Sequence, residues 1–119
     1  PSSPHRVWVR KQQEGGLAMA RSLGDLRLQR VGVIADPEVK RFQLNKDTDK
    51  FVVLASDGVW DHLDNQRVID IARRYIDQSA GKAAAAVSDA ARKQWGIQGG
   101  GYVDDITTVV VKLQLDSME

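Results

Sequence analysis

The sequence predicts an α+β fold with mainly antiparallel sheets and helices on one face of the sheet. Three patterns support this prediction. A continuous apolar run, Phe51–Ala55, predicts a buried strand, and residues 64–95 repeat apolar side chains at helical spacing. A final alternating segment, Ile106–Leu115, predicts another strand. The predicted order along the chain is therefore short strands, one buried strand, two helices and a last strand.

Length and composition limit the possible classes of protein. With 119 residues, 42% of them hydrophobic and 28% charged, the chain is long enough for one globular domain. A net charge of +1 does not point to a nucleic-acid or membrane-surface partner. The absence of cysteine excludes disulfides and thiolate metal sites and suits a reducing compartment, the cytoplasm or nucleus. No apolar run reaches membrane-spanning length. The sequence begins with Pro1 rather than Met, so we expect its N-terminus to be a cleavage site or a boundary chosen for expression.

The first part of the chain predicts short strands separated by turns. Arg6–Arg10 alternates in polarity and predicts a strand, and Gly15-Gly16 is expected to break the structure after it. Glu38–Leu44 predicts a second strand, followed by a polar turn at Asn45–Lys50.

The central strand is predicted with the clearest signal. Phe51–Ala55 is apolar at every position, which is typical of a strand covered on both faces. The run stops at Ser56-Asp57-Gly58.

Two helices are expected next. Asp64 is a suitable N-cap for the first, and Gly81 is expected to separate it from the second. Gly96–Gly101 predicts a glycine-rich loop after the second helix. The apolar positions that recur at helical spacing are Val68, Ile69, Ile71, Ala72, Tyr75 and Ile76, then Ala83, Val87, Ala90, Ala91 and Trp95.

Carboxylates are placed where two strands would meet. Asp57 follows the central strand, and Asp104 and Asp105 precede the last strand. If the two strands pair antiparallel, these residues converge at one edge of the sheet. Asp61 follows Asp57 by about one turn and reaches the same place if the chain is helical there.

Crowded carboxylates repel one another unless a cation or a proton neutralises them. Oxygen ligands suit Mg²⁺ or Mn²⁺ rather than zinc, and two such ions can activate water and polarise a phosphoryl group. Each motif alone has a simpler interpretation, because Asp-Gly after a strand is usually a turn and Asp-Asp before a strand is usually a solvated loop.

Four segments in order resemble the type 2C (PPM) family of metal-dependent serine/threonine protein phosphatases. The resemblance covers nearly the whole chain, and four ordered motifs are much more specific than one. They are Gly16–Asp25 (G-L-A-M-A-R-S-L-G-D), Val33–Val39 (V-I-A-D-P-E-V), Phe51–Asp61 (F-V-V-L-A-S-D-G-V-W-D) and Asp104–Thr107 (D-D-I-T).

This resemblance implies an α-β-β-α sandwich with a dinuclear Mg²⁺ or Mn²⁺ centre at one end. It implies that Asp57 and Asp104 are metal ligands and that Asp61 helps to hold a third, weaker metal. Asp105 stands where the family usually has Asn and is not assigned as a ligand.

The resemblance also bears on the first part of the chain. Arg21 and Asp25 match signature positions to which we assign a structural role. Residues 1–16 match a variable flap near the substrate cleft, where basic side chains would face a phosphoprotein. These side chains are Arg6, Arg10 and Lys11.

The chain departs from the family pattern in one respect. The Asp-Gly-His-Gly motif, which supplies the bridging ligand and a candidate general acid, does not occur, and Asp57-Gly58 is followed by Val59. Neither histidine, His5 or His62, has such a setting, and His62 is interpreted as a surface or capping residue. We therefore expect residues 1–119 to be the C-terminal part of one catalytic domain, with no catalytic residue assigned beyond the metal ligands. Such a chain is expected to be inactive alone, to bind its missing N-terminal half and to self-associate.

Two classes of function follow. The first is the active phosphatase, and the alternative is a pseudophosphatase or regulatory fragment that binds without catalysis. The sequence upstream of Pro1 would distinguish them. A phosphatase with an aspartate nucleophile is set aside, because that class needs a second Asp where this chain has Ala55.

Overall fold

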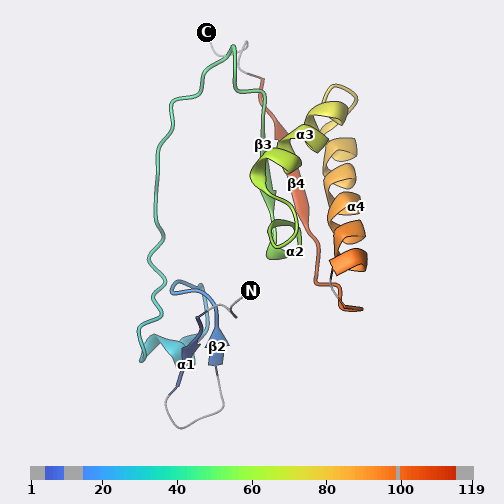
Figure 1. Cartoon of the computed structure of the whole chain (residues 1–119). Coiled ribbons are helices and arrows are strands. Elements are labelled where there is room, and N and C mark those ends of the chain that lie inside the picture. Colours follow the sequence, from blue (N-terminus) through green and yellow to red (C-terminus); the bar gives the residue numbers. More distant parts are fainter. Residues whose placement is uncertain (1–4, 10–14, 99, 115–119) are drawn as a thin grey trace. The chain divides into compact units, whose positions relative to one another are not determined.

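The structure is a computed structural model that describes residues 5–9, 15–98 and 100–114. The chain divides into two compact units, Pro1–Phe42 and Gln43–Glu119 (Figure 1). Each unit has its own apolar core, and each is described by itself.

The first unit is built on a small antiparallel pair of strands. Strand β1 (Val7–Trp8) pairs with β2 (Gly15–Leu17), and the single-turn helix α1 (Leu26–Gln29) follows. The predicted strand at residues 6–10 is thus confirmed at Val7–Trp8, while Arg10 lies outside the described residues. The core of this unit consists of Val9, Leu28 and Val33.

The prediction that Gly15-Gly16 breaks the structure was wrong, because both glycines lie in β2. Gly16 has a φ of 85°, and a β-carbon there would lie 2.8 Å from the Trp8 ring. The left-handed backbone favours glycine at this position, and the indole of Trp8 occupies part of the space that a side chain would need.

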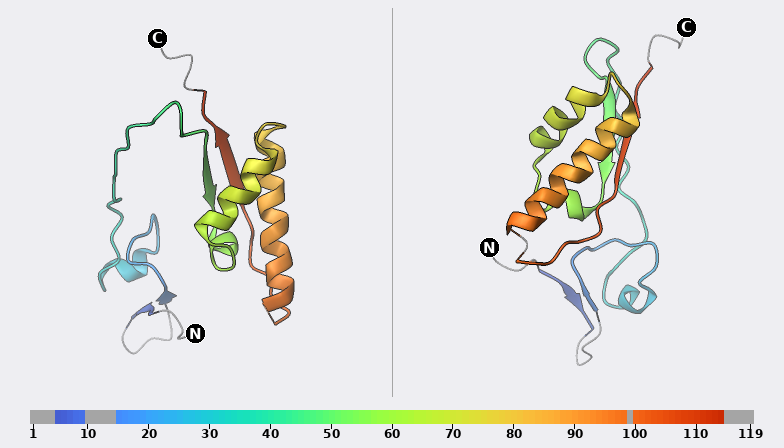
Figure 2. Two further views of the ribbon diagram at one scale, coloured as in Figure 1. Left: turned by 45° about the horizontal axis from the view of Figure 1, so that its top comes forward. Right: turned by 90° about the vertical axis from the view of Figure 1, so that its right-hand side faces the viewer.

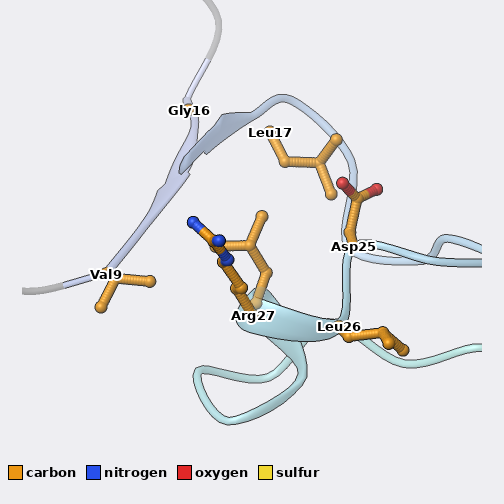
Figure 3. Close-up of a pocket in the computed structure, with 7 residues that line it drawn as sticks. Val9, Gly16, Leu17, Asp25, Leu26 and Arg27 are labelled. Carbon is orange, nitrogen blue, oxygen red and sulfur yellow. The ribbon is translucent and has the colours of Figure 1, made fainter. Parts of the chain in front are cut away.

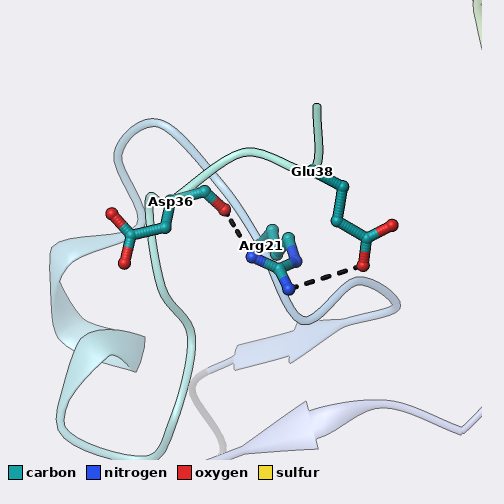
Figure 4. A network of polar contacts seen from close by, with 3 residues as sticks. All are labelled: Arg21, Asp36 and Glu38. Atoms are coloured by element: carbon teal, nitrogen blue, oxygen red, sulfur yellow. Dashed lines mark hydrogen bonds and ion pairs between the residues drawn. The ribbon is translucent and has the colours of Figure 1, made fainter. Parts of the chain in front are cut away.

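Arg21 holds the segment at residues 36–38 of the first unit in place (Figure 4). Its guanidinium donates to the main-chain carbonyl of Asp36 and forms an ion pair with Glu38 at 3.4 Å. Beyond this point the predicted strand at 38–44 was wrong: these residues are exposed and have no strand geometry. A strand needs a partner for its backbone N–H and C=O groups, and no described segment pairs with this one.

The second unit is a two-stranded sheet covered on one face by helices (Figure 2). Strand β3 (Phe51–Ala55) pairs antiparallel with β4 (Thr108–Lys112), with Val53 opposite Val110. This confirms the predicted strand at 51–55 and its antiparallel pairing with the last strand, which is shorter than predicted. Leu115 lies outside the described residues.

The helices α3 (Asn65–Tyr75) and α4 (Ala80–Gln98) supply the covering layer. Asp64 caps α3 as predicted, because its carboxylate accepts a 2.7 Å hydrogen bond from the Arg67 N–H. The predicted loop from Gly96 was wrong at its start, since α4 continues through Gly96 to Gln98. Gly81 also lies inside α4 rather than between the helices. The alanine-rich sequence and the packing of α4 outweigh the modest helix penalty of two glycines.

The core of the second unit lies between the sheet and the two helices. It consists of Val59, Leu63, Val68, Ile71, Ala72, Ile76, Ala83, Val87, Ala91 and Val110. Because side chains alternate along a strand, the other face of the sheet carries apolar residues that remain exposed. These are Val52, Leu54, Val109 and Val111, between 42% and 55% exposed. The expectation that β3 is covered on both faces was therefore wrong within this chain, because the helices cover only one face.

Candidate metal site at the edge of the sheet

Ser56 joins the two segments that carry the candidate ligands. Its hydroxyl donates a 2.8 Å hydrogen bond to the Asp105 carbonyl and accepts one of 3.1 Å from the Thr107 N–H. The Ser56 N–H also donates to the Thr107 carbonyl at 3.0 Å. The backbone next to Asp57 is therefore bonded to the backbone next to Asp104, as the antiparallel arrangement predicts.

Asp57 opens a helical turn that also orients Asp61. The turn is helix α2 (Asp57–Trp60), and the Asp61 N–H donates to the Asp57 carbonyl at 2.9 Å. Residues four apart in a helical turn lie on one face. The chain is helical after Asp57, as the prediction for Asp61 required, and both carboxylates are exposed. That Asp61 reaches the same ligand group as Asp57 and Asp104 stays a prediction.

Trp60 fixes the other end of this turn. Its indole N–H donates to the Ala55 carbonyl at 2.9 Å, and this carbonyl belongs to the last residue of β3. The turn is thus bonded to the strand from which it emerges, which limits the orientations open to the Asp57 backbone.

Asp104 is half-buried and has two internal partners. One of its carboxylate oxygens accepts a 2.8 Å hydrogen bond from the Asp105 N–H and a 3.4 Å hydrogen bond from the Tyr102 hydroxyl. The negative charge of Asp104 raises the pKa of Tyr102 above its ordinary value, with smaller contributions from burial, from the Asp104 hydrogen bond and from the charges of Asp105 and Asp57. Tyr102 therefore lies in the field of carboxylates from both segments.

The donors fit a hard divalent cation in chemistry, because Asp57, Asp61 and Asp104 offer only oxygen atoms. Their side chains do not come together as a ligand group in the described part of the chain. Within the described ranges, no three acidic or histidine side chains form a group that could hold a metal ion. The structure thus gathers the backbones of the predicted ligands, while their assignment as ligands remains a prediction.

An aromatic cluster that no sequence pattern predicted lies next to the acidic segments. Trp95 of α4 is 8% exposed, and its ring meets His62 and Tyr102 edge to face at centroid distances of 4.2 and 5.7 Å. His62 was expected on the surface, but it is half-buried, with Nδ1 3.1 Å from the Gln98 side-chain oxygen. Helical periodicity assigned Trp95 to the core and gave no sign of these contacts.

A separate cavity of about 560 Å³ lies in the first unit (Figure 3). It is lined by Val9, Gly16, Leu17, Asp25, Leu26, Arg27 and Leu28 and contains none of the predicted ligands. Asp25 has a left-handed backbone with φ 48° and accepts a 2.6 Å hydrogen bond from the Ser22 hydroxyl. This contact agrees with the structural role assigned to Asp25.

The family model for protein phosphatase 2C matches residues 5–95, which is most of the chain. The chain belongs to the protein phosphatase 2C family.

Two plant proteins are similar in sequence to almost the whole chain. "Probable protein phosphatase 2C 35" of Arabidopsis thaliana is 39% identical over 116 residues, covering 98% of this chain and 32% of its own length. "Probable protein phosphatase 2C 61" of the same plant is 43% identical over 118 residues, covering 94% and 34%. The chain thus spans about a third of the length of these relatives.

A solved structure has the same fold. The crystal structure of a serine-threonine phosphatase 2C from Toxoplasma gondii aligns with 88% of this chain and 32% of its own, with a TM-score of 0.76 and 23% identity. The predicted α+β class with antiparallel strands is confirmed. Within the part of the chain that the structure describes, no helix has the length and apolar character needed to cross a membrane.

Proposed function

We propose that this chain supplies part of the active site of a metal-dependent protein serine/threonine phosphatase. The observation that carries the proposal is the bonding of Ser56 to Asp105 and Thr107 across the end of the sheet. This bonding brings the backbones that precede Asp57 and follow Asp104 together, and it does so in a member of the protein phosphatase 2C family.

The proposed roles follow from position and charge. Asp57 and Asp104 would hold two Mg²⁺ or Mn²⁺ ions, and Asp61, one turn from Asp57, would help to hold a third, weaker ion. When bound, such ions provide a hydroxide nucleophile at neutral pH and polarise the phosphoryl group. Ser56 bonds the two ligand-bearing segments to each other through its hydroxyl, and Tyr102 donates a hydrogen bond to Asp104 within the second segment.

The remaining ligands would come from a part of the protein outside this sequence. The described residues give no group of three ligands, and hydrated Mg²⁺ gives up its waters reluctantly to a small number of carboxylates. We propose that a missing N-terminal half completes the site and that this chain alone has little activity.

The same half would cover the exposed face of the sheet. The four apolar side chains there would otherwise favour association between copies of the chain. The substrate would be a phosphoprotein, and the absence of cysteine supports a cytoplasmic or nuclear location.

The test is release of phosphate from a phosphoserine peptide by the full-length protein, with and without Mn²⁺. The proposal expects hydrolysis that stops on chelation and returns with added Mn²⁺. A full-length protein that binds the phosphoprotein but never hydrolyses it, at any Mn²⁺ concentration, would support the pseudophosphatase alternative.

A further inference from the structure

Trp95 contacts both segments that carry the proposed metal ligands. Its indole N–H donates a buried 2.7 Å hydrogen bond to the carbonyl of Gly58, the residue after Asp57. Its ring lies edge to face with that of Tyr102, whose hydroxyl donates to Asp104. One buried side chain of α4 is thus in contact with a residue adjacent to Asp57 and with a residue bonded to Asp104.

His62 adds a third contact on the same ring. It lies one residue beyond Asp61, and its imidazole meets the Trp95 ring at 4.2 Å with an interplanar angle of 76°. Its Nδ1 lies 3.1 Å from the side-chain oxygen of Gln98, which follows Trp95 by about one turn of α4. The end of the α2 turn is therefore also held against α4.

We propose that Trp95 is a positioning residue, which fixes the separation of Asp57 and Asp104 through Gly58 and Tyr102. This proposal rests on the proposed function, since it concerns the geometry of the same metal site. Trp95 itself would touch neither metal nor substrate, because it is buried and offers only an N–H donor that is already used.

The competing explanation is that Trp95 only fills the core. Buried tryptophans usually find a partner for their N–H, so the bond to Gly58 alone does not exclude this explanation. The two explanations differ in what they predict for metal affinity. A residue that only fills the core affects global stability, whereas a residue that positions ligands affects the affinity for Mn²⁺ at temperatures where the protein remains folded.

The experiment compares Trp95→Phe, which keeps a ring but removes the N–H, with Val87→Ala in the full-length protein. Val87 is a matched control, because it is also buried in α4, about two turns earlier, and belongs to the apolar core between the helices and the sheet. Affinity for Mn²⁺ is measured by calorimetric titration. Protection of peptides covering residues 56–61 and 102–107 is measured by hydrogen exchange without metal.

For Trp95→Phe we expect Mn²⁺ affinity to fall roughly tenfold and exchange to quicken in both peptides. Phosphatase activity should be lost at limiting Mn²⁺ and recovered at saturating Mn²⁺. For Val87→Ala we expect a lower melting temperature with unchanged Mn²⁺ affinity. If Trp95→Phe fails to fold, Tyr102→Phe and Tyr102→Leu separate the hydroxyl from the ring contact, and only the leucine variant should quicken exchange at residues 56–61.

Unchanged exchange in both peptides of Trp95→Phe would overturn the proposal, whether or not metal binds. Equal loss of Mn²⁺ affinity in Trp95→Phe and Val87→Ala would also overturn it. Failure of the proposed function looks different, because the unmutated protein would then bind no Mn²⁺. In that case the proposal still requires that Trp95→Phe, and not Val87→Ala, quickens exchange in both peptides.

Discussion

Gly58 packs directly against the main-chain carbonyl of Asp105, so closely that a β-carbon at position 58 would overlap the carbonyl oxygen. The same β-carbon would lie 3.2 Å from the Ile106 side chain. The glycine of the Asp-Gly pair after β3 is therefore needed for close packing as well as for the turn. Only glycine lets the turn that begins with Asp57 approach the segment that contains Asp104.

Gly58→Ala should therefore separate the two acidic segments. We expect it to destabilise the protein by about 1–3 kcal/mol, which is typical of overpacking against backbone that cannot move away. We also expect Mn²⁺ affinity to fall, because the carboxylates on either side of the contact move apart. Thermal unfolding and calorimetric titration measure the two effects.

Gly96→Ala is the control for this substitution. Gly96 lies inside α4, and a β-carbon there would meet nothing within 4 Å. Alanine is the better helix former, so this variant should be stabilised by about 0.5–1 kcal/mol with unchanged Mn²⁺ affinity. A Gly58→Ala protein as stable as the unmutated one would show that the close contact with Asp105 does not exist.

Tyr102 reports the negative charge of the site in the absence of metal. The charge of Asp104 disfavours the tyrosinate and raises the pKa of Tyr102. Asp104→Asn removes this charge, so the pKa of Tyr102 should fall toward its ordinary value. The chain has one other tyrosine, Tyr75, and a Tyr75→Phe background isolates the signal in an ultraviolet absorbance titration.

Asp89→Asn is the matched control for this titration. Asp89 is an exposed residue of α4 that is not among the groups acting on Tyr102. Its removal should leave the pKa of Tyr102 unchanged. An unchanged pKa in Asp104→Asn would instead contradict the contact between Tyr102 and Asp104.

The exposed face of the sheet should drive association of the chain alone. Leu54 and Val109 are opposite each other on this face, while Val110 on the other face is 9% exposed. The double substitution Leu54→Thr and Val109→Thr keeps residues that suit strands and removes apolar surface. Light scattering should show large species for the unmodified chain and a shift toward monomer for the double variant.

Val110→Thr is the control on the buried face. It should cost about 1–3 kcal/mol of stability, because it buries a hydroxyl in the core, and it should not relieve association. A monodisperse, fully active monomer of the unmodified chain would contradict the proposal that a missing half covers this face.

Asp61 is expected to matter less for metal binding than Asp57. Asp61→Asn should slow turnover while the tighter ions stay bound, because it is matched to the weaker site. Calorimetric titration should show these ions with nearly unchanged affinity. Loss of all Mn²⁺ binding in Asp61→Asn would reverse this ranking.

Sequence patterns predicted the parts of the fold that depend on local chemistry. The apolar run at Phe51–Ala55, the cap at Asp64 and the antiparallel pairing with the last strand were all confirmed. The strand and the cap each follow from a short pattern of residues, whereas the pairing followed from the predicted antiparallel sheet. The predicted strand at 38–44 failed because a strand also depends on a partner, which its own sequence does not reveal.

The candidate site was predicted in its location and not in its supporting contacts. The positions of Asp57 and Asp104 at the ends of their strands placed them at one edge of the sheet. The roles of Ser56, Gly58 and Trp95 depend on hydrogen bonds that join residues 37 to 51 positions apart and on the contacts of the Trp95 ring. Such contacts leave no periodic signal in a single sequence.

The most direct measurement is calorimetric titration of Mn²⁺ into the full-length protein and its Asp57→Asn and Asp104→Asn variants, together with phosphopeptide hydrolysis by each. Each substitution removes a charged oxygen donor while nearly preserving shape. We expect both variants to bind Mn²⁺ much more weakly and to lose most of their activity. Near-normal turnover of either variant at saturating Mn²⁺ would contradict the assignment of that aspartate as a metal ligand.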